Sequence, residues 1–171
     1  MHFKEFQNHI FPFKDRIYRL ARWMMNHNEE AEDVVQEIFL KLWVKRNELD
    51  KYNSVEAFIM RMTKNLCLDK LKSKVNSTSV DMKDHFQDNS PSPLRKTEMT
   101  DTMAILKTII SKLPHQQRLV MQLRTIEGYN NNEITEITGM SANNIRVMLS
   151  RARKSVRESY KQQIDYVQGN N

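Results

Sequence analysis

The sequence predicts an all-α protein made of two small helical domains joined by a flexible linker, and three observations lead to this prediction. The 171 residues include only 3 glycines and 4 prolines, whereas helix-favouring residues such as Leu, Met, Lys, Glu and Gln are plentiful. Apolar residues recur at helical spacing through residues 10–71 and again through residues 103–160. The stretch between them is polar and contains Pro91 and Pro93, which end helices.

These patterns divide the chain into a first domain at residues 1–72, a linker at 73–100 and a second domain at 101–171. Each domain is near the lower size limit for independent stability, so we expect both to rely on a partner. The net charge is +6, and the second domain carries 10 basic and 6 acidic side chains, against 13 and 11 in the first. A basic end favours a polyanionic partner, although an ordinary basic surface explains the composition as well.

Composition also excludes several classes of protein. A single cysteine, Cys67, rules out an internal disulfide, and its apolar neighbours Leu66 and Leu68 predict a place in the core. The sequence lacks an apolar run long enough to span a membrane and a signal-peptide pattern at its start. We therefore expect a cytoplasmic protein without membrane insertion. It also lacks a phosphate-binding Gly-rich loop, a metal-ligand cluster and a nucleophile–base pair, so we predict no enzymatic activity, no cofactor and no metal.

The helices of the first domain can be placed in order. The first helix begins near Phe13, with apolar side chains at helical spacing that end at Met24. The second opens in the acidic segment 28–33, whose carboxylates suit the positive end of a helix dipole. Ser54 is a plausible N-cap for a third helix at residues 55–72.

The second helix carries an unusual leucine. At 100° per residue its core face consists of Ala31, Val35, Ile38, Phe39 and Leu42. Asp33, Gln36 and Glu37 lie opposite, with Leu40 in the middle of this polar face and Trp43 at its edge. A desolvated centre with a charged rim is typical of a small protein–protein contact. A solvated face with one exposed leucine is the simpler interpretation of this feature alone.

One stripe of the third helix is polar on an otherwise apolar helix, and its members are Phe58, Arg61, Asn65, Asp69 and Lys72. The cations suit phosphates, Asn65 suits a base edge, and Phe58 suits a base plane, as in a site for a single nucleic-acid strand. A solvent-exposed stripe with Phe58 in the core is the alternative interpretation.

The strongest motif is a helix-turn-helix near the C-terminus. Residues 133–138 predict a short helix, Gly139 allows a tight turn, and Ser141 caps a second helix. The outward side of this second helix carries Asn143, Asn144, Arg146, Val147, Ser150, Arg151 and Lys154. Asparagine and arginine pair well with adenine and guanine in a major groove. Thr135 and Thr138 replace the apolar residues usual at their positions, and an ordinary helical hairpin with a basic face is the alternative.

Four segments resemble bacterial RNA polymerase sigma factors of the sigma-70 family, in chain order. Residues 30–43, EAEDVVQEIFLKLW, resemble region 2.2, and residues 57–69, AFIMRMTKNLCLD, resemble regions 2.3 to 2.4. The segment LPHQQR at 113–118 resembles the start of region 4, and residues 128–153 resemble its DNA-reading half. Only the linker lies between regions 2 and 4, as in the extracytoplasmic-function (ECF) subgroup. The tryptophan usual after Phe58 in the family is replaced by the Ile59-Met60 segment.

The resemblance implies a role for each of these surfaces in transcription initiation. Asp33, Gln36, Glu37 and Leu40 would bind the clamp of the largest subunit of core RNA polymerase. Phe58, Arg61, Asn65 and Lys72 would bind the −10 promoter element, and the helix after Ser141 would read the −35 element. The segment containing Leu113, Val120, Met121 and Leu123 would partly contact the flap of the second-largest subunit. An anti-sigma factor is a further candidate partner.

Two other functions remain open at this stage. A stand-alone transcriptional regulator would use the same helix-turn-helix with the first domain as a dimerisation or sensor module, and would bind a palindrome. A helical adaptor that binds only protein would have no use for the basic segment 146–161, which holds six basic residues and one acidic residue.

Overall fold

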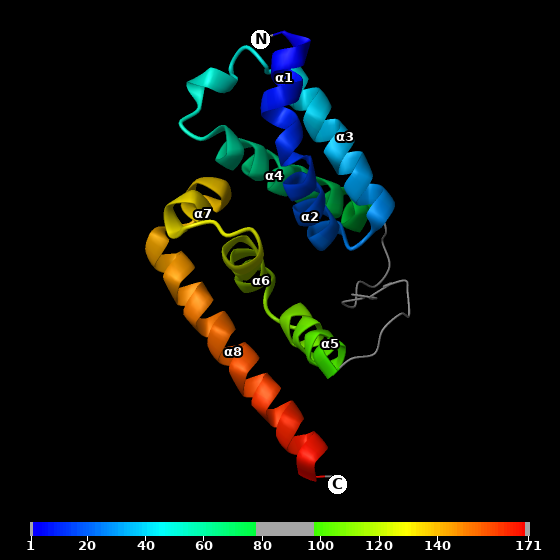
Figure 1. The fold of residues 1–171 in the computed structure, drawn as a ribbon, viewed down its shortest axis with the longest axis vertical. Helices are drawn as coiled ribbons and strands as arrows, with labels where there is room; N and C mark the ends of the chain where they lie inside the picture. The colour runs from blue at the N-terminus through cyan, green and yellow to red at the C-terminus, as the bar shows by residue number, and fades with distance from the viewer. Residues whose placement is uncertain (1, 78–97, 170–171) are drawn as a thin grey trace. The chain divides into compact units, whose positions relative to one another are not determined.

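A computed structural model describes residues 2–77 and 98–169, and every regular element in them is helical. The all-α prediction is therefore confirmed. The chain divides into two compact units: the first contains α1 to α4, and the second contains α5, α6, α8 and most of α7 (Figure 1). Residues 78–97 of the predicted linker lie outside the described residues. In the part that is described, none of the helices combines the length and the apolar character that crossing a membrane requires.

Three helices pack pairwise to form the core of the N-terminal unit: α2 (Lys14–Met25), α3 (Asn28–Val44) and α4 (Val55–Ser77). The short helix η2 (Leu49–Lys51) lies in the connection between α3 and α4. The largest fully buried side chains of this core are Ile10, Ile17, Leu20, Ile38, Leu42, Leu49, Ile59 and Met60. The buried residues of α2 and α3 recur at helical spacing, which is why the sequence pattern located these helices.

The N-terminal helix α1 (Phe3–Ile10) lies before the helical region that the sequence predicts, which begins near residue 10. The short helix η1 (Phe11–Phe13) follows it and holds Pro12 in its first turn. Phe6 of α1 is buried, and its ring centroid lies 5.2 Å from that of Trp43, edge to face. An eight-residue helix is marginal without tertiary contacts, so packing against α3 stabilises α1. Phe3, Phe6 and Ile10 recur at helical spacing, so α1 has a local signal that the prediction did not use.

Helix α4 begins as predicted, because the Ser54 hydroxyl accepts a hydrogen bond of 3.1 Å from the backbone N–H of Ala57. Its end differs from the expected one, since the helix continues past Lys72 to Ser77. Lys70 pairs with Glu37 at 3.0 Å, and Lys74 pairs with Glu30. These ion pairs join the last turns of α4 to α3, which accounts for the additional helical residues.

Cys67 is buried in this unit, and desolvation raises the pKa of its thiol to about 12. Because only the thiolate reacts with alkylating agents, we expect iodoacetamide at pH 8 to label native protein at least about a hundredfold more slowly than urea-unfolded protein. Mass spectrometry of the time course measures both rates. Equal rates would place Cys67 outside the core.

The C-terminal unit comprises α5 (Glu98–Ser111), α6 (His115–Met121), the π-helical turn η3 (Gln122–Ile126), α7 (Asn131–Thr138) and α8 (Ala142–Gly169). Both α5 and α6 pack against α8. The buried apolar side chains are Ile109, Leu113, Leu119, Val120, Leu123, Tyr129, Ile134, Ile137, Ile145, Leu149 and Ala152.

This core corrects one expectation from the sequence. Leu113, Val120 and Leu123 were assigned to a face that contacts a partner, but each is at most 6% exposed. Met121 alone of that group is half-buried. An apolar helical face has the same pattern whether it packs inside its own domain or on another protein, so the sequence could not separate the two cases.

Candidate protein and nucleic-acid interfaces

The acidic face of α3 has the exposure that the sequence predicts. Leu40 is 66% exposed, and Asp33 and Gln36 beside it are also exposed. Val44, one turn after Leu40, is 78% exposed and was not among the predicted residues. Two apolar side chains one turn apart, with a carboxylate and an amide at their border, form a small surface suited to a protein partner. We call Asp33, Gln36, Glu37, Leu40 and Val44 the acidic α3 face.

Glu37 differs from Asp33 because its carboxylate is already bound within the unit. It pairs with Lys41 at 2.9 Å and with Lys70 at 3.0 Å. Hydrogen bonds from these two ammonium groups hold the pKa of Glu37 below its usual value. Glu37 therefore joins α3 to α4, and Asp33 offers the more accessible charge on the acidic α3 face.

Trp43, at the edge of this face, is fixed by its neighbours. The rings of Phe3 and Phe6 meet it edge to face at centroid distances of 5.6 and 5.2 Å, and the Arg46 guanidinium lies 4.3 Å from its centroid. Phe3 is itself 62% exposed. The surface around α3 thus includes an aromatic side chain from α1. The sequence did not predict this contribution, because the packing of α1 on α3 joins residues far apart in the chain.

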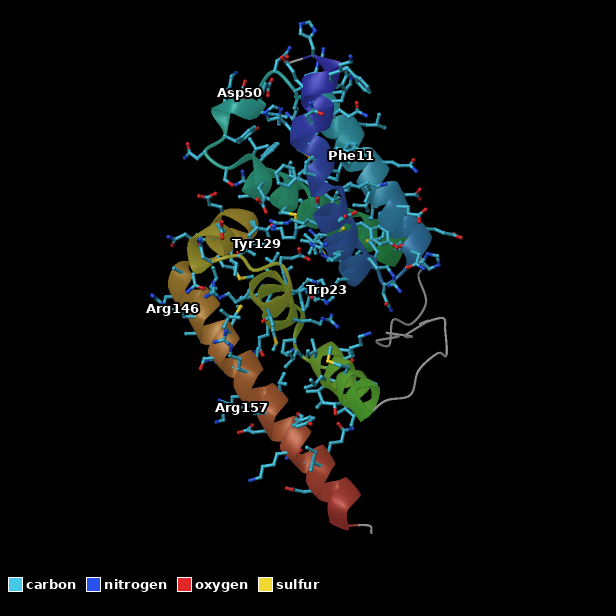
Figure 2. All side chains as sticks on the ribbon, viewed as in Figure 1. Phe11, Trp23, Asp50, Tyr129, Arg146 and Arg157 are labelled. Atoms are coloured by element: carbon cyan, nitrogen blue, oxygen red, sulfur yellow. The ribbon has the colours of Figure 1, made fainter. Side chains whose placement is uncertain are left out.

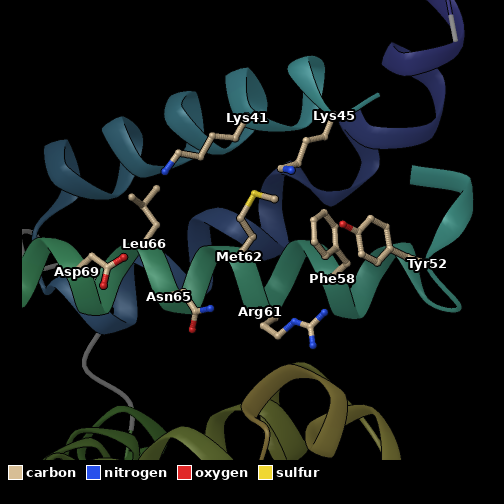
Figure 3. Close-up of a pocket in the computed structure, with 9 residues that line it drawn as sticks. All are labelled: Lys41, Lys45, Tyr52, Phe58, Arg61, Met62, Asn65, Leu66 and Asp69. Atoms are coloured by element: carbon tan, nitrogen blue, oxygen red, sulfur yellow. The ribbon is translucent and has the colours of Figure 1, made fainter. Parts of the chain in front are cut away.

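The polar stripe of α4 borders a pocket of about 240 Å³ (Figure 3). Phe58, Arg61 and Asn65 line it, as the prediction of a shared site requires, whereas Lys72 is not among the lining residues. Asp69, also a member of the predicted stripe, lines the pocket too. The sequence missed the other contributors, which come from α3, the connection to α4, and α4 itself: Lys41, Lys45, Tyr52, Met62 and Leu66.

An aromatic pair stands at one end of the pocket. The rings of Tyr52 and Phe58 stack with centroids 3.8 Å apart and planes 17° from parallel. Figure 3 shows Arg61 and then Asn65 following Phe58 along α4, with Lys41 on α3 and Lys45 just after the end of α3. Aromatic rings, an amide and several cations around one opening are the groups that hold an unstacked base and its flanking phosphates.

The helix-turn-helix has the local geometry that the sequence predicts. Gly139 ends α7 in the left-handed conformation, with φ of 77°. The Ser141 hydroxyl then accepts a hydrogen bond of 3.2 Å from the Asn144 N–H and caps α8. At the other end of α7, Asn130 and Glu133 form a reciprocal capping box. All the predicted outward residues are exposed: Asn143, Asn144, Arg146, Val147, Ser150, Arg151 and Lys154.

The two threonines that depart from the usual motif do not disrupt it. Both Thr135 and Thr138 are half-buried. The Thr135 hydroxyl donates a hydrogen bond of 2.9 Å to the carbonyl oxygen of Asn131, one turn earlier in α7. Its polar group is thus satisfied within the helix, so a hydroxyl is tolerated where a small apolar side chain is common.

The turn itself can be tested by substitution at Gly139. A Cβ there would meet no atom within 4 Å, so the cost of Gly139→Ala is that of the left-handed backbone, about 1–2 kcal/mol. Asparagine adopts this conformation more readily, so we expect Gly139→Asn to cost less. Urea unfolding of the full chain measures both. A Gly139→Ala protein as stable as the wild type would contradict the turn geometry.

Two family models match the chain in the order of the two units. Residues 12–76 match sigma-70 region 2, and residues 103–156 match sigma-70 region 4. Together the matches cover most of the sequence and contain both the α4 pocket and the helix-turn-helix. The chain belongs to the sigma-70 family. The resemblance found in the sequence is thereby confirmed.

Curated relatives include ECF sigma factors of similar length. The chain is 24% identical over 156 residues to the ECF RNA polymerase sigma factor SigW of Bacillus subtilis, covering 85% of this chain and 83% of that protein. It is 29% identical over 140 residues to the probable RNA polymerase sigma factor RfaY of Xanthomonas campestris. That match covers 79% of this chain but only 35% of the Xanthomonas protein. A match to the ECF sigma factor SigE of Mycolicibacterium smegmatis covers 57% of that protein. The chain therefore spans only part of the length of these two relatives.

Solved structures show the same fold. The sigma factor RpoE of Bartonella quintana, crystallised with the anti-sigma factor NepR, aligns with a TM-score of 0.71 at 20% identity, over 92% of this chain and 98% of that one. CnrH, solved with the cytosolic domain of CnrY, aligns with a TM-score of 0.65 at 19% identity, over 92% and 88%.

Proposed function

We propose that this chain is an ECF-type RNA polymerase sigma factor that binds core RNA polymerase and directs promoter recognition and transcription initiation in the cytoplasm. The observation that carries the proposal is the pairing, on one chain, of a region 2 unit with a region 4 unit. The first has an exposed acidic α3 face and a pocket of aromatic and cationic groups, and the second has a helix-turn-helix. In this proposal the chain binds core RNA polymerase and promoter DNA, and it catalyses no reaction.

The acidic α3 face is the proposed contact with the clamp of the largest polymerase subunit. Leu40 and Val44 supply apolar area, and Asp33 and Gln36 supply polar groups at the border. Phe3 beside Trp43 extends the apolar area toward α1. Glu37 would contribute to polymerase binding mainly by holding α4 against α3, because its carboxylate already pairs with Lys41 and Lys70.

The α4 pocket is the proposed site for the −10 element as a single strand. Stacked Tyr52 and Phe58 offer an aromatic face to a base, and Asn65 offers an amide to its edge. Arg61 lines the same pocket and would hold a phosphate, while Lys72 would reach a phosphate further along the strand. The outward side of α8 is the proposed reader of the −35 element, as duplex in a major groove.

Two further partners belong to the proposal. The flap of the second-largest subunit would contact the region 4 unit through exposed apolar side chains, and Met103 and Ile126 are 55% and 59% exposed. An anti-sigma factor would hold the chain inactive. The complex of the Bartonella sigma factor with NepR supports this partner class.

Footprinting separates this proposal from a stand-alone regulator. A sigma factor bound to core polymerase should protect two dissimilar promoter elements, and the chain alone should give no comparable pattern. A regulator of the helix-turn-helix class would instead protect an inverted repeat without polymerase. Protection of an inverted repeat by the chain alone would overturn the proposal.

A further inference from the structure

Glu37 lies where the acidic α3 face meets the α4 pocket, and its carboxylate is shared between two lysines. Lys41 pairs with it at 2.9 Å and Lys70 pairs with it at 3.0 Å. Of these two lysines, Lys41 lines the pocket, whereas Lys70 joins α4 to α3. One carboxylate of the proposed polymerase contact therefore neutralises a cation of the proposed single-strand site.

The order of side chains around α3 accounts for this arrangement. At 100° per residue, Glu37 lies between Leu40, which is exposed on the acidic α3 face, and Lys41. Glu37 and Lys41 are one turn apart with the carboxylate on the N-terminal side, which is the favourable order for an ion pair on a helix. Figure 3 shows the Lys41 side chain extending from α3 toward α4, near Leu66. One turn of α3 thus connects the two surfaces.

The ion pair is accessible to ligands of both surfaces. The Glu37 and Lys41 side chains are 36% and 47% exposed. Hydrogen bonds from Lys41 and then from Lys70 hold the pKa of Glu37 below its usual value, so the carboxylate is charged at neutral pH. A phosphate that reaches Lys41 from the pocket competes with this carboxylate, because both anions bind the same ammonium group.

We infer that the ion pair between Glu37 and Lys41 couples polymerase binding to single-strand binding. In the free chain the carboxylate holds Lys41. When a backbone phosphate of the strand takes the Lys41 ammonium, Glu37 keeps only Lys70 and gains attraction for a cation of the polymerase clamp. Each ligand therefore strengthens the binding of the other, because the coupling between two sites is reciprocal. The inference rests on the proposed function, since it assumes these occupants for the two surfaces.

The affinity of the chain for core polymerase, measured with and without saturating single-stranded DNA, tests this coupling. The DNA comes from the −10 region of a promoter that the holoenzyme uses. The ratio of the two affinities should be about two- to fivefold lower for Glu37→Gln than for the wild type, as expected for one partly exposed ion pair. Without polymerase, Glu37→Gln should bind the strand more tightly than the wild type, because Lys41 has lost its competing anion.

Two control variants separate the coupling from a general change of charge or packing. Glu48→Gln removes the carboxylate that pairs at 3.9 Å with Lys45, which also lines the pocket. Glu48 lies in the connection between α3 and α4, where Figure 2 labels Asp50, and outside the acidic α3 face. This variant should keep the wild-type ratio. Lys70→Gln removes a link between α3 and α4 but keeps the pair with Lys41, so it should also keep most of the ratio.

A wild-type ratio in Glu37→Gln would overturn the inference. An equally large loss in Lys70→Gln would also overturn it, because Glu37 would then act only by holding α4 in place. Lys41→Gln removes the ammonium for which the two anions compete, so it should lower the ratio to the same extent. It provides the same test if melting curves show that Glu37→Gln is unfolded. Failure of the wild-type chain to bind polymerase or the strand would instead count against the proposed function.

Discussion

Asp33→Arg should weaken the binding of this protein to core RNA polymerase by at least tenfold, without changing its helicity or melting temperature. Asp33 is exposed beside Leu40, which is itself 66% exposed, so the substitution disturbs no packing. Reversing a charge at the border of a desolvated contact removes an attraction and adds a repulsion, which together cost about 2 kcal/mol or more. Titration of labelled protein with purified core polymerase measures the loss.

Two matched variants sharpen this experiment. Asp50→Arg makes the same charge reversal at another exposed aspartate of the N-terminal unit, outside the acidic α3 face, and should bind polymerase normally. Glu37→Gln should lose less affinity than Asp33→Arg, because Lys41 and Lys70 already pair with the Glu37 carboxylate. If Asp33→Arg binds polymerase as tightly as Asp50→Arg does, the acidic α3 face is not the polymerase contact.

Asn65→Ala and Arg151→Ala should impair promoter use at different steps. Asn65 lines the α4 pocket beside Phe58, so its loss should leave closed-complex binding largely intact and slow opening of the duplex. Arg151 is exposed on the base-reading side of α8, so its loss should cost about 1–3 kcal/mol and relax specificity at one upstream position. Transcription from duplex templates and from templates with a pre-melted −10 bubble, together with footprints of the closed complex, separates the two steps.

The bubble template should largely restore transcription by Asn65→Ala but should not restore upstream discrimination by Arg151→Ala. Lys72→Ala serves as a control on the same α4 stripe, because Lys72 lies outside the pocket lining. Its loss should change the salt dependence of binding rather than the rate of opening. Identical defects of Asn65→Ala and Arg151→Ala on both templates would show that the two units do not divide promoter reading in this way.

Local signals in the sequence predicted the features that depend on a few neighbouring residues. The turn at Gly139 and the cap at Ser141 are set by backbone freedom and one hydroxyl, so the helix-turn-helix could be placed before the structure was known. Helical periodicity likewise placed Leu40 on the outside of α3 and brought Phe58, Arg61 and Asn65 to one side of α4.

Features that depend on packing between helices could not be predicted. Helix α1 is held by the contact of Phe6 with Trp43, far apart in the sequence. Lys41 enters the α4 pocket because α3 packs against α4, and Lys45 and Tyr52 enter it through the connection between these two helices. The sequence also could not show that Leu113, Val120 and Leu123 are buried in the core of the C-terminal unit, where they are not available to a partner.

Transcription reconstituted from purified components tests the proposed function most directly. Core RNA polymerase should produce transcripts from defined start sites on genomic DNA only when this protein is added, and the DNA upstream of those sites should share two dissimilar elements. Asp33→Arg should reduce all of these transcripts together, because it acts before any promoter is chosen. A transcript pattern that is the same with and without the protein would contradict its role as a sigma factor.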